Sequence, residues 1–322
     1  MRYESSLQSS RWSLARVLRG CALTIALSST LALPGCAIFG EEPDAFDRGL
    51  SHINQGEYPQ AIEELRRFCQ NNPEDDIAWY NLGVAYQSND QLELAEDAYR
   101  SALQANKEHA RSMVNLATIQ DETGRYTQAG EWLRRAGRVE TSRAYPLYSL
   151  GYHLQRQNMP EEADEAFRAA LEREPDNALA NYRYAFFLKQ NVRYNESLAH
   201  YERAIKSSPD DLVALVEGGD VAFAIGAYSR SVALYERALA IKPSLVKPAV
   251  NLAESYLNLE RPRKAAIWAW HALDHDAENL RATDVALRAY AALQAQDQAR
   301  ALAVQEKRYE MEREKSKAAA EE

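Results

Sequence analysis

The chain has 322 residues, a formal net charge of −9 at pH 7, and hydrophobic residues at 46% of its positions. An acidic chain is a poor nucleic-acid binder, because contacts with phosphates need a basic face. The length would suffice for two ordinary globular domains, but the sequence is repetitive from residue 42 onward. In a repeat array each unit packs only on its neighbours, so domain counting by length does not apply.

The first 35 residues have the pattern of a targeting segment. Three arginines between residues 11 and 19 make the start positive, and an apolar run follows from Cys21 to Leu33. This run is shorter than the ~20 apolar residues that a transmembrane helix needs. We therefore predict that residues 1–35 are a signal peptide.

The apolar run ends in Leu33–Pro34–Gly35–Cys36. This pattern resembles the lipobox of bacterial lipoproteins, in which the cysteine thiol is linked to diacylglycerol and the chain is cut before that cysteine. The resemblance implies a lipid anchor on Cys36, followed by a short linker over residues 36–41. Several acyl chains hold a protein on a bilayer almost permanently. An ordinary secretory signal that contains a cysteine, or an uncleaved anchor, is the alternative.

Residue 37 is Ala, whereas enterobacterial lipoproteins kept in the inner membrane have Asp at that place. The resemblance therefore implies the bacterial outer membrane, with the chain facing the periplasm. Only Cys69 remains in a mature form that starts at Cys36, so no internal disulfide is expected. We predict a small, partly buried side chain for Cys69, with an intermolecular disulfide as the alternative.

Residues 76–109 show the repeating unit most clearly. Trp79, Leu82 and Tyr86 are spaced as one face of a helix, and a second helix with the same spacing follows after a polar turn. Gly83 is small where the two helices must touch. Neither helix can bury its apolar face alone, so the unit needs neighbours.

The neighbours follow in a constant 34-residue register. Small residues recur at the position of Gly83 throughout: Gly49, Gly83, Ala117, Gly151, Ala185, Gly219 and Ala253. This pattern resembles the tetratricopeptide repeat (TPR), a helix–turn–helix unit. The resemblance implies an all-α, right-handed superhelical solenoid, with seven repeats over residues 42–279. The predicted repeats are 42–75, 76–109, 110–143, 144–177, 178–211, 212–245 and 246–279. A degenerate eighth repeat is expected over 280–303, and a charged capping helix or tail over 304–322.

The turn between the two helices of a repeat contains a residue that tolerates a left-handed backbone in most repeats. Glycine serves in three of them, at Gly56, Gly124 and Gly226. Val192 and Glu260 depart from this pattern. We therefore expect altered loops in the fifth and seventh repeats.

No catalytic constellation is evident in the sequence, and we predict no enzyme activity, no cofactor and no metal site. His271 and His275 lie at the i, i+4 spacing that can chelate a metal, but no third ligand is evident. Acidic residues are plentiful, yet they fall at the outward positions of the helices. Two half-exposed histidines near a helix end are the simpler interpretation.

The first helix of each TPR lines the face that binds peptides in this family. At its positions the sequence has aromatic residues in the middle repeats and acids, Asp220 and Glu254, further on. Tyrosine offers a large, rather rigid apolar surface with one polar tip, which suits an interface. Packing of these rings between adjacent helices is the alternative. The predicted protein-binding groove comprises Tyr80, Tyr145, Tyr148, Tyr152, Tyr182 and Phe186.

A lipoprotein made almost wholly of TPRs resembles the pilotin-type proteins of type IV pilus systems, which help an outer-membrane secretin to assemble. The resemblance implies a lipid-anchored periplasmic scaffold for envelope assembly. An adaptor for cell-wall hydrolases or a protease is one alternative, and an accessory protein of polysaccharide export is another. The expected partner is a protein or peptide in the groove, and a homo-oligomer is possible in principle because TPR edges often pair. Nucleic acid is not expected.

Overall fold

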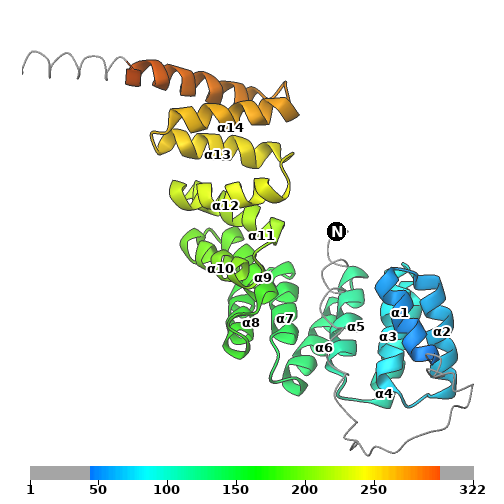
Figure 1. Ribbon diagram of the computed structural model, residues 1–322. Coiled ribbons are helices and arrows are strands. Elements are labelled where there is room, and N and C mark those ends of the chain that lie inside the picture. Colours follow the sequence, from blue (N-terminus) through cyan, green and yellow to red (C-terminus); the bar gives the residue numbers. More distant parts are fainter. Residues whose placement is uncertain (1–43, 298–322) are drawn as a thin grey trace, which may run out of the picture. The chain divides into compact units, whose positions relative to one another are not determined.

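The computed structural model describes residues 44–297, which are α-helical throughout apart from turns. The chain divides into two compact units, one ending at Thr141 and the other beginning at Ser142. Within each unit the helices stack side by side in chain order (Figure 1). The predicted all-α architecture of repeated helix pairs is confirmed. No strand occurs between residues 44 and 297.

Each repeat consists of a helix A and a helix B. In the first unit these are α1 Ala45–Gln55, α2 Tyr58–Asn71, α3 Asp76–Ser88, α4 Leu92–Ala105, α5 Ala110–Glu122 and α6 Tyr126–Val139. In the second unit they are α7 Tyr145–Arg156, α8 Pro160–Arg173, α9 Ala178–Gln190, α10 Tyr194–Ser207, α11 Leu212–Ala224, α12 Tyr228–Ile241, α13 Val246–Asn258 and α14 Pro262–His275. A further helix occupies residues 280–297, the end of the described range.

Polar side chains start several of the A helices. Asp75, Asn177 and Asp211 each accept a backbone N–H from the first turn of the following helix, at 2.8 to 3.0 Å. Such N-caps satisfy donors that the helix itself leaves unpaired. Helices α8 and α14 instead begin with Pro160 and Pro262, whose missing N–H costs nothing in the first turn. In these repeats a local sequence signal therefore marks the residue at which a helix begins.

The turn from helix A to helix B has one left-handed residue in every repeat. Glycine, Asp90 and Asn158 adopt it at little cost, and Val192 (φ 60°) and Glu260 (φ 57°) adopt it as well. The expectation of altered loops at these two residues is therefore wrong. The packing of the two flanking helices fixes the conformation of the turn. Val192 and Glu260 therefore adopt the left-handed backbone although it is unfavourable for these residue types.

Close approach of helices A and B explains the small residues in register. A Cβ on Gly83 would lie 2.5 Å from Cε1 of Tyr99, and one on Gly219 would lie 2.6 Å from Cε1 of Tyr235. Both distances are shorter than any tolerable contact, so a larger residue would push the helices apart. The rings of Tyr99 and Tyr235 fill the space that each glycine leaves, and both are fully buried.

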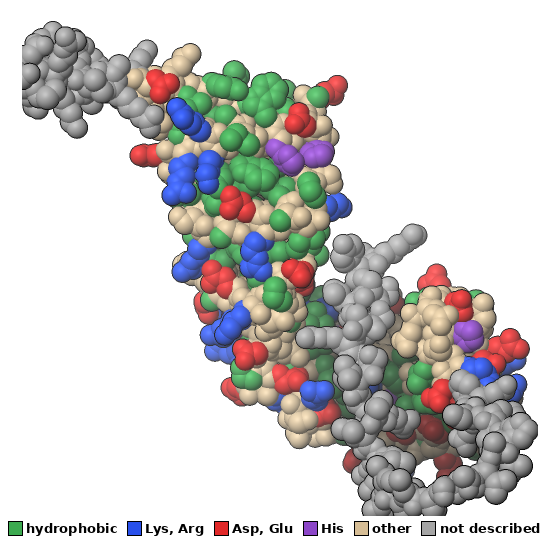
Figure 2. Space-filling view, viewed as in Figure 1, with side chains coloured by type: hydrophobic (Ala, Val, Ile, Leu, Met, Phe, Trp, Pro, Cys, Tyr) green, Lys and Arg blue, Asp and Glu red, His purple; other side chains and the backbone are tan. Residues whose placement is uncertain are grey.

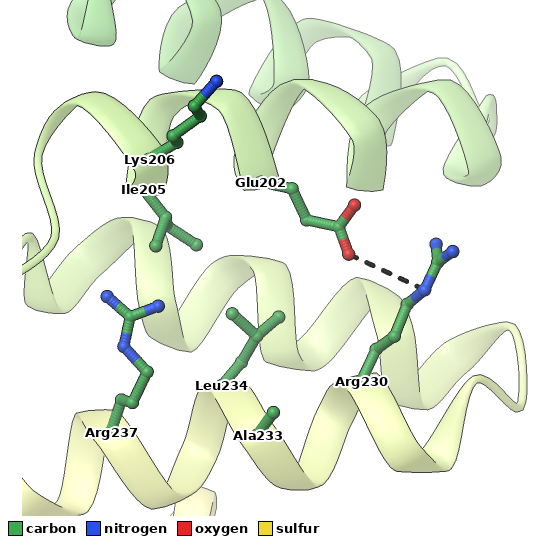
Figure 3. A pocket seen from close by; sticks show the side chains of 7 residues that line it. All are labelled: Glu202, Ile205, Lys206, Arg230, Ala233, Leu234 and Arg237. Atoms are coloured by element: carbon green, nitrogen blue, oxygen red, sulfur yellow. Dashed lines mark ion pairs between the residues drawn. The ribbon is translucent and has the colours of Figure 1, made fainter.

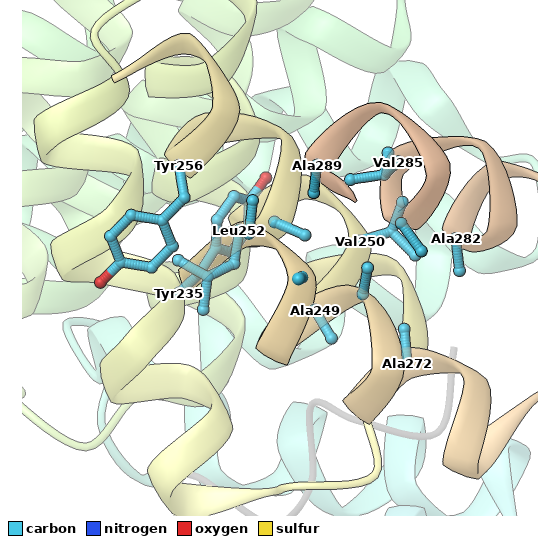
Figure 4. Packing of buried hydrophobic residues seen from close by; sticks show 14 of the residues in the cluster. Tyr235, Ala249, Val250, Leu252, Tyr256, Ala272, Ala282, Val285 and Ala289 are labelled. Carbon is cyan, nitrogen blue, oxygen red and sulfur yellow. The ribbon is translucent and has the colours of Figure 1, made fainter. Parts of the chain in front are cut away.

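The last described helix completes the core of the second unit. Residues 282, 285, 286 and 289 of the helix over 280–297 pack with buried residues of α13 and α14, and Tyr235 and Tyr256 lie in the same cluster (Figure 4). This cluster is built mostly of alanines, so the helices lie close together. The helices are thus held by a broad contact between closely packed alanines, without large side chains.

Several predictions concern residues outside the described range. The signal peptide over 1–35, the lipidated Cys36, the linker over 36–41 and the tail over 304–322 all lie there, as does part of the eighth repeat over 280–303. Cys69 is described, and it is fully buried in α2 with no disulfide partner. Burial raises the pKa of its thiol to about 12, so this cysteine is protonated and shielded at neutral pH.

Candidate functional site

The second unit brings five of the predicted groove residues onto two neighbouring helices. Tyr145, Tyr148 and Tyr152 belong to α7, and Tyr182 and Phe186 belong to α9. Helix α7 packs directly against α9, because each is the helix A of its repeat. All five side chains are half-buried, so each leaves part of its ring at the surface. This arrangement offers adjacent aromatic rings to a ligand.

An arginine completes this group. The guanidinium of Arg183, on α9, lies 4.7 Å from the ring centre of Tyr152 and 5.8 Å from that of Tyr148. A cation over the face of an aromatic ring is attracted by about 0.5–2 kcal/mol, depending on its exposure. We call Tyr148, Tyr152, Tyr182 and Arg183 the aromatic face. It presents apolar ring surface next to one fixed positive charge.

Sequence reasoning missed Arg183. Its place in the 34-residue register holds asparagine in three other repeats, at Asn81, Asn115 and Asn251. The sequence signal for it was an arginine at a position where other repeats have asparagine, near the tyrosines of the preceding helix A. The chain therefore carries a cation next to the aromatic residues of the helix A face.

Tyr182 connects the aromatic face to the core. Its ring meets the ring of Tyr201 edge-on at 5.9 Å, and Tyr201 is fully buried on α10. The hydroxyl of Tyr201 has no hydrogen-bond partner among the described residues. Burial, followed by the nearby Glu217, raises the pKa of Tyr201 well above its usual range. Tyr182 is therefore held by packing on one side and exposed on the other.

Tyr80 belongs to the first unit and is described separately. Its ring lies 5.1 Å from that of His109 and 6.0 Å from that of Tyr99, and its side chain is half-buried. Burial raises the pKa of the Tyr80 phenol. These contacts are those of a ring packed between helices α3 and α4 and the start of α5. For Tyr80, the structure therefore agrees with the alternative interpretation, in which the ring packs between adjacent helices.

The helix A positions are held in place by hydrogen bonds from buried tyrosines of helix B. The Tyr99 hydroxyl donates to Gln87 (2.8 Å) and accepts from Asn115 (3.0 Å). In the second unit, the Tyr235 hydroxyl donates to Asp220 (2.5 Å) and accepts from Asn251 (2.9 Å). Each tyrosine thus joins the helix A of its own repeat to the next one. Two of the three recurring asparagines, Asn115 and Asn251, make this link, whereas Asn81 donates to the carbonyl oxygen of Ile77 in its own helix.

The acids on the helix A face are paired with cations. Lys189 contacts Glu217 at 2.6 Å, Lys247 contacts Asp220 at 2.5 Å, and Arg281 contacts Glu254 at 2.5 Å. Each ion pair joins one helix A to the next, from α9 through α11 and α13 to the helix over 280–297. We call these three pairs the ion-paired face. Its charges are compensated within the chain, so it offers little net charge to a ligand.

The two histidines of α14 contact each other, and one of them contacts the preceding repeat. Their rings lie 5.0 Å apart, and Nε2 of His271 is 2.8 Å from the carbonyl oxygen of Pro243. No group of three potential ligands occurs in the part of the chain that the structure describes. Over the visible face of the second unit, acidic, basic and hydrophobic side chains are interspersed (Figure 2). Within residues 44–297, no helix combines the length and apolarity needed to cross a bilayer.

Comparison with solved structures supports the fold. The chain is similar to YrrB, a TPR protein described as having an unusual peptide-binding site (21% identity, TM-score 0.51, 59% of this chain and 97% of that one). It is also similar to pilF of Pseudomonas aeruginosa (21% identity, TM-score 0.53, 65% and 94%) and to PilW, described as a type IV pilus biogenesis factor (16% identity, TM-score 0.51, 65% and 97%).

Curated relatives match only parts of the chain. Superkiller complex protein 3 of Mus musculus is 33% identical over 82 residues, which is 26% of this chain and 5% of that protein. Photosystem I assembly protein Ycf3 of a Synechococcus strain is 31% identical over 85 residues, 26% of this chain and 49% of that protein. This chain therefore spans about half the length of this Ycf3 and only 5% of superkiller complex protein 3.

The family model described as "Tetratricopeptide repeat" matches residues 46–106, 85–143, 148–211 and 187–245, which together cover more than half of the chain. These ranges coincide with the helix pairs from α1 to α12. Proteins of this family bind peptide or protein partners. The repeated helix pairs, the glycine–tyrosine contacts in register and this match together establish that the chain belongs to the tetratricopeptide repeat family.

Proposed function

We propose that the protein is a lipid-anchored periplasmic scaffold that holds a protein partner on its helix A face during assembly of an envelope complex. The observation that carries the binding part is the aromatic face. Adjacent half-buried rings on α7 and α9, with Arg183 stacked against two of them, are available to a partner. The few residues that dominate the binding energy of protein interfaces are enriched in tryptophan, tyrosine and arginine.

The chemistry of the aromatic face favours an apolar helix or an extended segment as the ligand. Rings of Tyr148 and Tyr152 give flat apolar surface, and their hydroxyl groups give polar edges. The planar side chain of Arg183 lies over two of these rings and extends the flat surface. The ion-paired face does not compete for the same ligand, because its acids and cations already bind each other.

The membrane part of the proposal rests on the sequence Leu33–Pro34–Gly35–Cys36 and the apolar run before it. The similarity to PilW supports type IV pilus biogenesis, and with it secretin assembly, as the envelope system. At these identities the similarity concerns the fold, and the pilus system is therefore our specific proposal. Ala37 supports an outer-membrane location.

The groove is tested by capture of the partner from membranes. The full-length protein is extracted from its native host with its anchor, and bound proteins are identified after cross-linking. Tyr148→Ala with Tyr152→Ala should reduce capture of the principal partner at least tenfold. Tyr126→Ala, an exposed tyrosine of the first unit, should leave it unchanged. Normal capture by the double variant, folded as judged by circular dichroism, would exclude the aromatic face.

The anchor and the pilus system have their own tests. Mass spectrometry of membrane-extracted protein should find acyl chains on Cys36, and Cys36→Ala should release the protein from membranes. Deletion of the gene should reduce assembled secretin on an immunoblot and abolish pilus-dependent surface motility. An unmodified Cys36 in native membranes would remove the anchor, and unchanged secretin levels would remove the pilus system.

Self-association is part of the same proposal. Large apolar side chains are exposed at the end of the second unit, in α14 and the helix over 280–297. The most exposed are Ile267, Trp270, Leu280, Leu287 and Tyr290. Apolar surface gathered at one end of a repeat array favours contact with another protein surface. Sedimentation of the mature protein should show a dimer that Leu287→Glu dissociates, and a monomer at all concentrations would contradict this.

A further inference from the structure

The outward face of helix α14 differs from that of the other B helices. Ile267 is 65% exposed and Trp270 is 51% exposed. In the six preceding repeats, the register position of Ile267 has an acid or alanine, at Glu63, Asp97, Glu131, Glu165, Ala199 and Ala233. The position of Trp270 has arginine or glutamate, at Arg66, Arg100, Arg134, Arg168, Glu202 and Glu236. On α14 an apolar pair therefore replaces charged and small residues.

The equivalent positions on α10 and α12 show the ordinary state of this face. They lie in a shallow hollow between the two helices (Figure 3). Glu202, in the place of Trp270, lies 3.7 Å from Arg230, and Ala233 takes the place of Ile267. A paired charge and a small side chain leave little apolar surface in water. On α14 the same two positions expose large apolar groups, which favour contact with another surface.

Trp270 is held in position by the next helix. Its Nε1 donates to the hydroxyl of Tyr290, on the helix over 280–297, at 2.8 Å. The ring of Tyr290 is itself half-exposed, so it extends the apolar surface of α14. The hydrogen bond restrains the indole ring, and a restrained side chain loses less freedom when a partner covers it. Tryptophan and tyrosine are enriched among the residues that dominate protein interfaces.

Opposite charges flank the apolar pair at equal spacing. Arg263 lies four residues before Ile267, and Asp274 lies four residues after Trp270. With about 3.6 residues per turn, these four positions fall on one stripe of the helix. Arg263 and Asp274 are exposed, and neither side chain has an ion-pair partner among residues 44–297. They are about 16 Å apart along the helix axis, which is too far for them to pair with each other.

The order of these four side chains makes the face complementary to itself. Along α14 it is basic, apolar, apolar and acidic, and its spacing is symmetric about the middle of the stripe. When two such faces meet antiparallel, Arg263 of each copy lies opposite Asp274 of the other. Ile267 then lies opposite Trp270. A parallel arrangement would instead bring like charges together. A two-fold axis generates the antiparallel contact, because it places the same patch of both copies face to face.

We propose that α14 packs antiparallel against α14 of a second copy of this chain, across a two-fold axis. This inference rests on the self-association proposed above and names its contact. Ile267 and Trp270 of the two copies form the apolar centre. Two symmetric pairs of Arg263 with Asp274 close its ends, and Tyr290 extends the contact to the helix over 280–297.

The test is sedimentation equilibrium of the mature protein at low ionic strength. Arg263→Asp and Asp274→Arg should each weaken the dimer at least tenfold, because each turns two attractive contacts into repulsive ones. The variant with both reversals should regain a dissociation constant within threefold of the wild type, since opposite charges face each other again. Glu165→Arg, which reverses an exposed acid on the outward face of α8, should change the dissociation constant less than twofold.

Two further arms locate the contact between copies. A mixture of the Arg263→Asp and Asp274→Arg variants should form a mixed dimer as tight as that of the wild type, because both of its end contacts join opposite charges. Ile267→Glu should abolish the dimer while circular dichroism shows a folded protein, since the replaced side chain is exposed. Loss of the dimer in Leu287→Glu but not in Ile267→Glu would place the contact on the last helix and overturn the proposal.

The outcomes separate this contact from self-association as such. A dimer that the single reversals leave unchanged, or that the double reversal does not restore, would overturn the antiparallel contact and leave self-association standing. A wild type that is monomeric at all concentrations would remove both. Binding of a monomeric wild type to phosphatidylglycerol vesicles, abolished by Ile267→Glu, would assign this face to lipid and contradict the proposal.

Discussion

The aromatic face and the ion-paired face are built from the same positions of successive A helices, yet their chemistry differs. Where α7 has Tyr152, α11 has Asp220 and α13 has Glu254 in the same register. The ring of Tyr152 remains half-exposed and stacks with Arg183, whereas both acids bind a cation of the next helix A. One register position thus either leaves ring surface exposed or joins two repeats through an ion pair.

The difference shows that the helix A face of this array is not chemically uniform. Ion pairs between neighbouring helices satisfy their own charges and fix the stacking of α9, α11 and α13. The aromatic rings of α7 and α9 keep apolar surface in contact with water, which only a ligand could cover. Substitutions in the ion-paired face should therefore mainly change stability, whereas substitutions of the exposed tyrosine rings should mainly change the binding proposed above.

The largest expected effect on stability is at Asp220. This carboxylate accepts from Tyr235, Lys247 and Asn251, and its removal leaves buried donors poorly satisfied. Asp220→Ala should lower the free energy of unfolding by about 2–3 kcal/mol, measured by urea denaturation followed by circular dichroism. Asp220→Asn keeps an acceptor for Tyr235 and should cost less. Equal losses for the two variants would show that the hydrogen bonds are not the cause.

A pH effect is expected beside the aromatic face. His200 packs against Tyr184 at 4.6 Å and contacts Asn181 through Nδ1 at 2.9 Å. Burial, followed by the charge of Arg203, lowers the pKa of His200 to about 4. The unfolded chain, with a histidine pKa of about 6.5, binds the proton first as the pH falls.

The contribution of His200 is therefore complete above pH 6.5 and is lost between pH 6.5 and 4. The loss should amount to about 1–2 kcal/mol, since the ring is partly exposed. The wild type and His200→Gln should diverge in urea midpoint at pH 7 and converge towards pH 4. Parallel pH profiles would contradict the assigned pKa.

The turns between helices A and B also differ from repeat to repeat in the residue that has a positive φ. Val192, between α9 and α10, has a positive φ and an exposed side chain, whereas Gly226 fills the equivalent place between α11 and α12. A β-branched residue in this conformation is strained by about 1 kcal/mol. Val192→Gly should therefore raise the thermal midpoint, and Gly226→Val should lower it. A lower midpoint for Val192→Gly would show that glycine's greater freedom in the unfolded chain outweighs the strain.

Two substitutions of Arg183 distinguish the contribution of its packing from that of its charge. Arg183→Ala should cost about 1 kcal/mol of stability, through loss of the contacts with Tyr148 and Tyr152. Arg183→Lys keeps the charge but not the planar stacking group, and should recover only part of that loss. Full recovery in the urea midpoint would show that charge alone matters at this position.

The smallest effect is expected at the outer end of the ion-paired face. Arg281 is half-exposed, and exposed ion pairs contribute at most about 1 kcal/mol. Glu254→Gln should therefore lower the free energy of unfolding by about 0.5 kcal/mol at low salt and by less in 1 M NaCl, where charges are screened. A loss that does not change with salt would indicate a packing role for Glu254.

The sequence by itself determined the helix pairs, their 34-residue register and the small residues between them, because helix periodicity and close contact leave direct traces in residue type. It also placed Tyr148, Tyr152 and Tyr182 on the helix A face. Only the tertiary structure decided that Arg183 stacks on two of these rings and that Val192 adopts the turn of a glycine. It alone showed that Asp220 and Glu254 are paired with cations of the next helix A. Such outcomes depend on contacts between helices of different repeats, and a one-dimensional pattern does not specify which side chains meet.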